Sequence, residues 1–289
     1  MPERDYRGNT EPEGSKDFWD GETIQIHNDE GKVIAVVPLE FARQGGCSTW
    51  QELGEVMSYL FPNHQDVPLL WKKDSQLLPA EDHVEAGPVL LFPSKVVTPS
   101  VFAPQSLQRA PSTASGSSSR TSQRSEASDS SAQHKFRDRV LNRDGRKCVV
   151  TNVVEHIEAA HVIPKSDPQG YKYALGDIVT TLYHTSFGIT LWCPIRRMFD
   201  ADEVAFLPRI EADGTLTLVF HIFKLPVGDP TTNFIVQGLR RLHGKMVSYP
   251  STTLAAPDVK LLRLQYSRVL YRRMVVWGLM EASRTGLDA

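Results

Sequence analysis

Apolar residues fall into two regions of this chain, separated by a polar stretch. In the first region, Trp50, Leu53 and Val56 are spaced as on one face of a helix, which we expect to run from Ser48 to about Leu60. Alternating or continuous apolar runs predict strands, and the turn residues 28–31 join the first two strands in a hairpin. The strands are predicted at residues 23–26, 32–37, 67–71 and 89–92.

The second region combines short helices and strands and closes with a long helix. Phe136, Val140 and Leu141 predict a short helix that ends at residue 144, before a glycine. A long C-terminal helix is predicted from residue 258, because the apolar residues that follow lie on one stripe. Both regions therefore mix helices with strands, which predicts an α+β fold. Further strands are predicted at residues 148–151, 204–207 and 216–222.

Composition sets the expected domain boundaries. Residues 1–20 are polar and lack apolar periodicity, so we expect a disordered leader. Residues 94–134 are dense in Ser, Pro, Thr, Ala and Gln, and a stretch so poor in large apolar residues buries too little surface to offset chain entropy. We therefore expect a disordered linker there. The 289-residue chain then has two folded domains, a small α+β domain at 21–93 and a second domain at 135–285.

Charge and cysteine usage narrow the classes of function. The formal net charge is −2, so a surface that binds nucleic acid must be local rather than a property of the whole molecule. The three cysteines are widely spaced and form no Cys-x-x-Cys pair, which argues against a zinc knuckle and a disulfide framework. No signal peptide and no apolar run of membrane-spanning length is present, so we expect an intracellular protein of the nucleus or cytoplasm, without a membrane partner.

Three segments of the second region carry a motif. Residues 143–151 read Arg-Asp-Gly-Arg-Lys-Cys-Val-Val-Thr, and residues 158–164 read Glu-Ala-Ala-His-Val-Ile-Pro. Residues 187–200 read Phe-Gly-Ile-Thr-Leu-Trp-Cys-Pro-Ile-Arg-Arg-Met-Phe-Asp. In this order the segments resemble the core of the HNH nuclease domain, the ββα-metal fold, in the version common in fungal proteins. The resemblance implies a β-hairpin and a helix that hold one divalent metal ion, Mg²⁺ or similar, against the scissile phosphate.

The resemblance also implies roles for individual residues. His161 matches the general base that removes a proton from water. Asp200 is retained and is a candidate metal ligand, together with Glu158 and with His184, a nearby spare histidine. On a strand, however, Glu158 lies on the face opposite to His161, so it is not an automatic substitute for the usual acidic ligand.

Other positions of the motif differ from the family pattern. The residue before the base is Ala160, the Asn that orients the base corresponds to Phe187, and the helix histidine corresponds to Arg196. A phenyl ring cannot hydrogen-bond an imidazole, so the orienting role is lost or moved. An arginine cannot coordinate a metal ion, although it can clamp a phosphate. Three of the four expected catalytic positions are therefore substituted.

Basic residues are concentrated just before the motif. The cluster from Lys135 to Lys147, which includes Arg137 and Arg139, contains more cations than carboxylates. Such a surplus of positive charge could bind phosphates, and this binding would weaken with salt. The alternative is a helix face that is simply exposed to solvent. The candidate nucleic-acid-binding residues are Arg143, Arg146, Lys147, Arg196 and Arg197.

Three hypotheses follow. The first is a metal-dependent endonuclease that hydrolyses the phosphodiester bonds of DNA or RNA. The second is a catalytically inactive pseudo-nuclease that keeps the fold and binds nucleic acid or protein. The third is an interaction protein that recruits a protein partner through residues 21–93, whose order of hairpin, helix and strands resembles a ubiquitin-like β-grasp. A small α+β cap is the alternative for that region.

Overall fold

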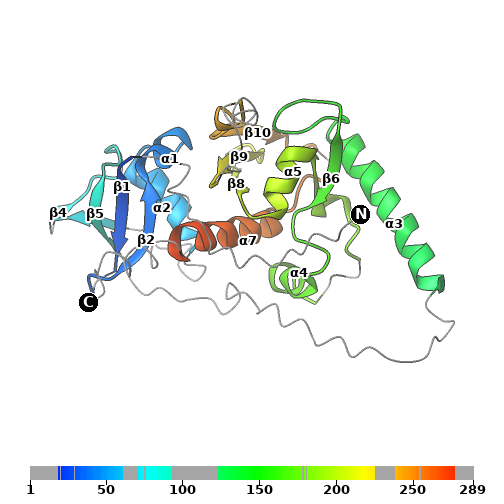
Figure 1. The fold of residues 1–289 in the computed structure, drawn as a ribbon, viewed down its shortest axis with the longest axis horizontal. Coiled ribbons are helices and arrows are strands. Elements are labelled where there is room, and N and C mark those ends of the chain that lie inside the picture. Colours follow the sequence, from blue (N-terminus) through cyan, green and yellow to red (C-terminus); the bar gives the residue numbers. More distant parts are fainter. Residues whose placement is uncertain are drawn as a thin grey trace, which may run out of the picture.

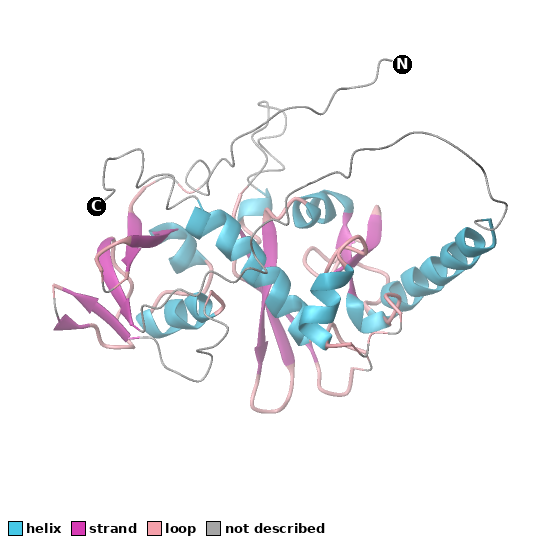
Figure 2. Ribbon diagram, turned by 90° about the horizontal axis from the view of Figure 1, so that it is seen from below, coloured by secondary structure: helices cyan, strands magenta, loops and turns pink. Residues whose placement is uncertain are grey.

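The computed structural model describes residues 19–60, 70–92, 123–224 and 238–276, apart from the single positions 20, 29, 75, 178, 180 and 254. These residues form a mixed α+β structure with three small sheets (Figures 1 and 2). The predicted fold class is therefore confirmed at this level. Among the described helices, none combines the length and the apolar composition needed to cross a bilayer.

The N-terminal region is built on a five-stranded sheet with the order β2-β1-β5-β3-β4. Strands β1 (Thr23–His27) and β2 (Val33–Pro38) form an antiparallel hairpin, and β1 pairs in parallel with β5 (Gly87–Phe92). Three of the predicted strands are thereby confirmed. The predicted strand at 67–71 coincides in part with β3, and its residues 67–69 lie outside the described residues. The remaining elements are β3 (Leu70–Lys73), β4 (Gln76–Leu77), α1 (Leu39–Gln44) and α2 (Trp50–Ser58).

Side chains at the ends of these elements explain where they begin. The hairpin turn is stabilised by Asn28, whose Oδ1 accepts hydrogen bonds from the backbone amides of Glu30 and Lys32. Helix α2 begins with a capping box, in which the Thr49 hydroxyl accepts from the Glu52 amide and the Glu52 carboxylate accepts from the Thr49 amide. The helix predicted from Ser48 to about Leu60 is confirmed as α2, and the apolar face that predicted it is buried.

The C-terminal region contains a two-stranded and a three-stranded sheet. Strand β6 (Ile157–His161) pairs antiparallel with β7 (Gly188–Trp192), and α5 (Cys193–Asp200) follows directly. The second sheet has the order β10-β9-β8 and packs against the C-terminal helix. Its elements are β8 (Val204–Ile210), β9 (Leu216–Ile222), β10 (Lys245–Tyr249), α7 (Val259–Leu270) and the π-helix η4 (Tyr271–Val276). The other elements are α3 (Gln123–Arg143), α4 (Pro168–Leu175) and the 3₁₀-helix η3 (Thr185–Phe187).

Two local predictions need correction. The strand predicted at residues 148–151 is a turn, in which the Asn152 amide donates to the Cys148 carbonyl and Asn152 has a φ of +62°. Cys148 and Val150 are buried, so the apolar residues of this segment fill the core instead of alternating on a strand. Residues 123–134 were predicted as linker, but they belong to α3; they include no Pro or Gly that would end the helix. Residues 94–122 lie outside the described residues.

The two regions share one hydrophobic core. Residues of the five-stranded sheet and α2 pack against β8, β9 and the C-terminal helix, which Figure 1 shows between the two regions. Trp19, within the predicted leader, is fully buried in this core, and its indole donates to the Ile222 carbonyl at 3.1 Å. The prediction of a disordered leader is therefore wrong for Trp19, while residues 1–18 lie outside the described residues.

Buried polar groups reinforce this contact. His221 donates from Nε2 to the Gly45 carbonyl at 2.8 Å and accepts from the Tyr266 hydroxyl at 2.6 Å. His243 accepts from the Ile222 amide at 2.9 Å and donates to the Phe41 carbonyl at 3.0 Å. The two imidazoles thus donate to carbonyls at the C-terminal end of α1: His221 to Gly45, and His243 to Phe41, whose carbonyl also accepts from the Gly45 amide. Burial lowers the pKa of His221 from 6.5 to about 4, so the ring is neutral at physiological pH.

This burial predicts acid sensitivity. As the pH falls from 6.5 to about 4, the unfolded chain takes up a proton at residue 221 that the folded protein does not, so the free energy of unfolding decreases. The decrease attributable to His221 is roughly 3 kcal/mol. Urea unfolding measured from neutral pH to about pH 4 should show it. His221→Gln keeps a donor and an acceptor without titrating, and an equally steep pH dependence in that variant would contradict the role of His221.

The backbone of Gly244 lies very close to the backbone of Gln44, and this predicts a loss of stability when Gly244 is replaced. Gly244 has a φ of +76°, and a Cβ there would overlap the Gln44 carbonyl oxygen of the other region. We expect Gly244→Ala to lower the free energy of unfolding by about 3 kcal/mol, since it adds overlap to left-handed strain. Gly214→Ala is the matched control, because its φ is +80° but the nearest atom, Ser251 Cβ, is 3.4 Å away. The control should lose only about 1 kcal/mol, and equal losses in urea unfolding would sink the explanation.

Candidate functional site

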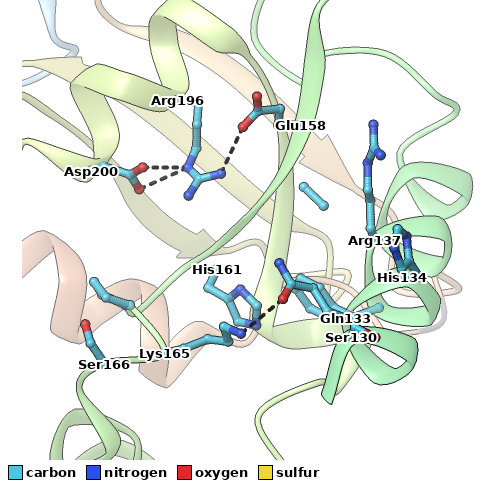
Figure 3. A pocket seen from close by; sticks show the side chains of 13 residues that line it. Ser130, Gln133, His134, Arg137, Glu158, His161, Lys165, Ser166, Arg196 and Asp200 are labelled. Atoms are coloured by element: carbon cyan, nitrogen blue, oxygen red, sulfur yellow. Dashed lines mark hydrogen bonds and ion pairs between the residues drawn. The ribbon is translucent and has the colours of Figure 1, made fainter. Parts of the chain in front are cut away.

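The β6–β7 hairpin, α5 and α3 surround a pocket with a volume of about 910 Å³ (Figure 3). Helix α3 projects from the side of the molecule and forms one wall (Figures 1 and 2). The opposite wall comes from β6 and α5, and the loop after β6 forms an end. The residues that line the pocket are Ser130, Gln133, His134, Phe136, Arg137, Glu158, Ala159, His161, Pro164, Lys165, Ser166, Arg196 and Asp200.

His161 stands at the end of β6, as the motif predicted, and lines this pocket together with Arg196 and Asp200 of α5. The imidazole is stacked on Phe136 of α3, with ring centroids 4.1 Å apart. Its Nε2 lies 3.1 Å from the Leu182 carbonyl oxygen. A carbonyl only accepts hydrogen bonds, so Nε2 carries the proton and Nδ1 keeps its lone pair in the neutral ring. The Leu182 carbonyl thus orients the imidazole.

The electrostatic surroundings keep this ring neutral. Burial lowers the pKa of His161 from 6.5 to about 4, the Leu182 hydrogen bond opposes the shift, and the charges of Lys165 and Arg196 add to it. Nδ1 has no hydrogen-bond partner among the described residues. It is also not among their buried polar atoms that lack a partner, so it is accessible from the pocket that His161 lines. At physiological pH the pocket therefore contains a neutral imidazole whose lone pair is available.

The position of α3 depends on a glycine. Gly188 pairs with His161 in the β6–β7 ladder, and a Cβ at Gly188 would lie 2.5 Å from Phe136 Cζ and 2.8 Å from Val140 Cγ2. The missing side chain lets α3 pack directly on the hairpin, which brings Phe136 beneath the imidazole. The neighbouring Phe187 is 9% exposed and packs in the core beside Tyr171. It takes no part in orienting His161, a role that the structure gives to the Leu182 carbonyl.

Arg196 joins the two carboxylates that were candidates for metal binding (Figure 3). Its Nε lies 3.0 and 2.8 Å from the two oxygens of Asp200, and its Nη1 lies 3.3 Å from Glu158 Oε2. A divalent cation between these carboxylates would lie against a guanidinium that cannot lose its charge. Within the described ranges, no group of three or more His, Cys, Asp or Glu side chains is arranged to hold a metal ion. The residues present therefore do not fit a divalent metal.

His184, the third candidate ligand, lies apart from this arrangement. Its Nδ1 is 2.7 Å from the Ser186 hydroxyl and accepts from the Ser186 amide, so the side chain caps η3. It does not line the pocket. The structure thus brings Glu158 and Asp200 together through Arg196 but does not bring His184 to them.

Arg143, a candidate nucleic-acid contact, is used inside the protein. Its side chain is 5% exposed and forms a two-pronged ion pair with Asp144, whose side chain is fully buried. The guanidinium also donates to the carbonyls of Thr185, Gly188 and Ala255. Asp144 in turn accepts from the Thr190 amide and the Tyr249 hydroxyl. This cluster is a structural joint between α3, η3, β7, β10 and the loop before α7.

The other basic candidates are exposed. Arg146, Lys147 and Arg197 lie on the surface and do not line the pocket, and Arg146 donates to Asn142. The pocket instead contains Arg137 and Lys165. Lys165 was not predicted as a site residue. Ser130, Gln133 and Arg137 were not predicted as a pocket wall either, although their spacing in the sequence places them on one face of a helix. The Lys165 ammonium lies 3.1 Å from the Tyr183 hydroxyl and 3.3 Å from Gln133 Oε1.

The buried ion pair predicts a large effect on stability. Arg143→Met would leave the Asp144 carboxylate buried without its cation and three carbonyls without their donor, so we expect the free energy of unfolding to fall by about 3–5 kcal/mol. Arg146→Met removes an exposed arginine nearby and should change it by less than about 0.5 kcal/mol. Chemical denaturation of both variants makes the comparison, and a small loss for Arg143→Met would disprove the structural role.

No known family model, curated protein or solved structure matches this chain.

Proposed function

We propose that the pocket binds the phosphodiester backbone of a nucleic acid and that the protein is a pseudo-nuclease, which does not carry out metal-dependent hydrolysis. The β6–β7 hairpin followed by α5, with His161 and Asp200 on one pocket, supports the resemblance to the ββα-metal fold. The strand order β2-β1-β5-β3-β4 with α2 after the hairpin likewise supports a β-grasp-like N-terminal region.

The observation that carries the proposal is the place of Arg196. Its guanidinium is held between Glu158 and Asp200, the two carboxylates that a metal ion would need. A fixed arginine supplies positive charge and hydrogen-bond donors for a phosphate, but it supplies no Lewis acid and no activated water. The pocket can therefore bind a phosphate without supporting metal-dependent hydrolysis.

The charges around the pocket favour an anionic ligand. Arg137, Lys165 and Arg196 contribute three positive charges, while Glu158 and Asp200 contribute two negative ones, so these five side chains together carry one net positive charge. Arg137 forms no hydrogen bond or ion pair with the described residues, and its charge is therefore available to a ligand. This local surplus agrees with a chain whose overall net charge is −2.

Binding of fluorescein-labelled DNA and RNA oligonucleotides, followed by fluorescence anisotropy across a salt series, tests the proposal. We expect affinity to fall with salt, and Arg137→Ala to weaken binding and reduce the slope of log K against log salt by about one. Arg196→Ala should weaken binding further, because it removes a donor and leaves two carboxylates facing the phosphate. Lys172→Ala on α4 is the control, since Lys172 is exposed and outside the pocket, and it should bind as the unaltered protein does.

Incubation of supercoiled plasmid and labelled RNA with Mg²⁺, Mn²⁺ or Zn²⁺ decides between binding and hydrolysis. We expect no metal-dependent cleavage. Cleavage that requires the metal and disappears in His161→Ala would favour the endonuclease hypothesis instead. Absence of salt-dependent binding in the anisotropy series would remove the nucleic-acid proposal altogether.

A further inference from the structure

His161 offers the pocket a hydrogen-bond acceptor that a phosphate cannot satisfy. The Leu182 carbonyl holds the Nε2 proton of His161, so Nδ1 presents a lone pair to the pocket. A phosphodiester oxygen is itself an acceptor and carries the negative charge, so it suits Arg137 and Arg196 but not Nδ1. A ligand that uses the whole pocket must therefore place a hydrogen-bond donor at His161 beside a phosphate at the arginines.

The surroundings prevent Nδ1 of His161 from gaining a proton and becoming a donor. Phe136 covers one face of the ring at 4.1 Å, and the positive charges of Lys165 and Arg196 disfavour a second proton. Lys165 is hydrogen-bonded to Tyr183 and Gln133, which keeps its ammonium close to the ring. The imidazole thus stays a neutral acceptor in a cationic setting throughout the physiological pH range.

Among the parts of a nucleic-acid backbone, only RNA places a donor directly next to a phosphate. The ribose 2′-hydroxyl lies on the carbon beside the one that carries the 3′-phosphate, and it distinguishes RNA from DNA for many proteins. We propose that the pocket is selective for RNA over DNA, with the 2′-hydroxyl donating to Nδ1 of His161 while Arg137 and Arg196 bind the adjacent phosphate. This inference rests on the proposed function and names its substrate class.

The matched ligands are single-stranded oligouridine, the 2′-deoxyuridine oligomer and 2′-O-methyl oligouridine of the same length. These chains have the same base and the same charge and differ only at the 2′ position. Fluorescence anisotropy should show oligouridine binding about twofold to tenfold more tightly than the deoxy chain, the range expected for one net hydrogen bond. The 2′-O-methyl chain has no donor, so it should bind no more tightly than the deoxy chain.

The variant that tests the residue is His161→Phe. A phenyl ring keeps a stacked partner for Phe136 but has no acceptor, so the variant should bind oligouridine and the deoxy chain equally. The measure is the ratio of the two affinities within one variant, and Lys172→Ala, outside the pocket, should keep the full preference for oligouridine. If the ring change disturbs the pocket, His161→Asn provides a second variant with both a donor and an acceptor, and it should retain part of the preference.

The results separate this inference from the function on which it rests. Equal binding of oligouridine and the deoxy chain by the unaltered protein would overturn the RNA preference and leave phosphate binding in place. A preference that persists in His161→Phe would also overturn it, since the selectivity would then arise elsewhere. Failure of every chain to bind would remove both proposals. The result that supports the inference is a preference for oligouridine in the unaltered protein that is lost in His161→Phe.

Discussion

The ion pair between Arg143 and Asp144 is the interaction on which the C-terminal region depends. Two neighbouring residues at the end of α3 contact η3, β7, β10 and the loop before α7 through one guanidinium and one carboxylate. A buried charge pair contributes to a fold only when its remaining donors and acceptors are satisfied, and here carbonyls, an amide and a phenol satisfy them. Burial and the nearby Asp144 charge raise the pKa of Tyr249 well above its ordinary value, so its hydroxyl remains a donor.

The pocket is a consequence of that joint. With α3 fixed at Arg143 and packed on Gly188, the helix continues past the hairpin, and its polar face becomes a wall opposite α5. Phe136 supports His161 from the same helix, and the carbonyl of Leu182 fixes the ring from the other side. Across the pocket, the Arg196 guanidinium lies between Glu158 and Asp200 and forms an ion pair with each of them. The pocket therefore combines a neutral imidazole with two carboxylates that an arginine bridges.

Sequence reasoning identified what is encoded locally. The hairpin at Asn28 and the capped helix α2 follow from turn residues, caps and periodicity, all of which act over a few residues. The strand that ends in His161 was expected from the motif resemblance. Sequence reasoning did not reveal which arginines form buried ion pairs inside the protein. Arg143 and Arg146 look alike in a run of basic residues, yet one is buried and one is exposed, because Asp144 meets partners more than forty residues away. The backbone carbonyl of Leu182 carries no signal in the sequence, so the partner that orients His161 could not be predicted.

The shared core also constrains how the chain is assembled. Trp19 donates to a carbonyl 203 positions later, and the sheet that contains Thr23 to Phe92 is completed by side chains from β8, β9 and α7. Contacts of such long range slow folding, because loop closure precedes the gain from packing. During synthesis the N-terminal region has no cover for this apolar face until β9 and α7 leave the ribosome. The early part of the chain must therefore wait for the late part, and a nascent chain stalled in between would expose an adhesive surface to other proteins.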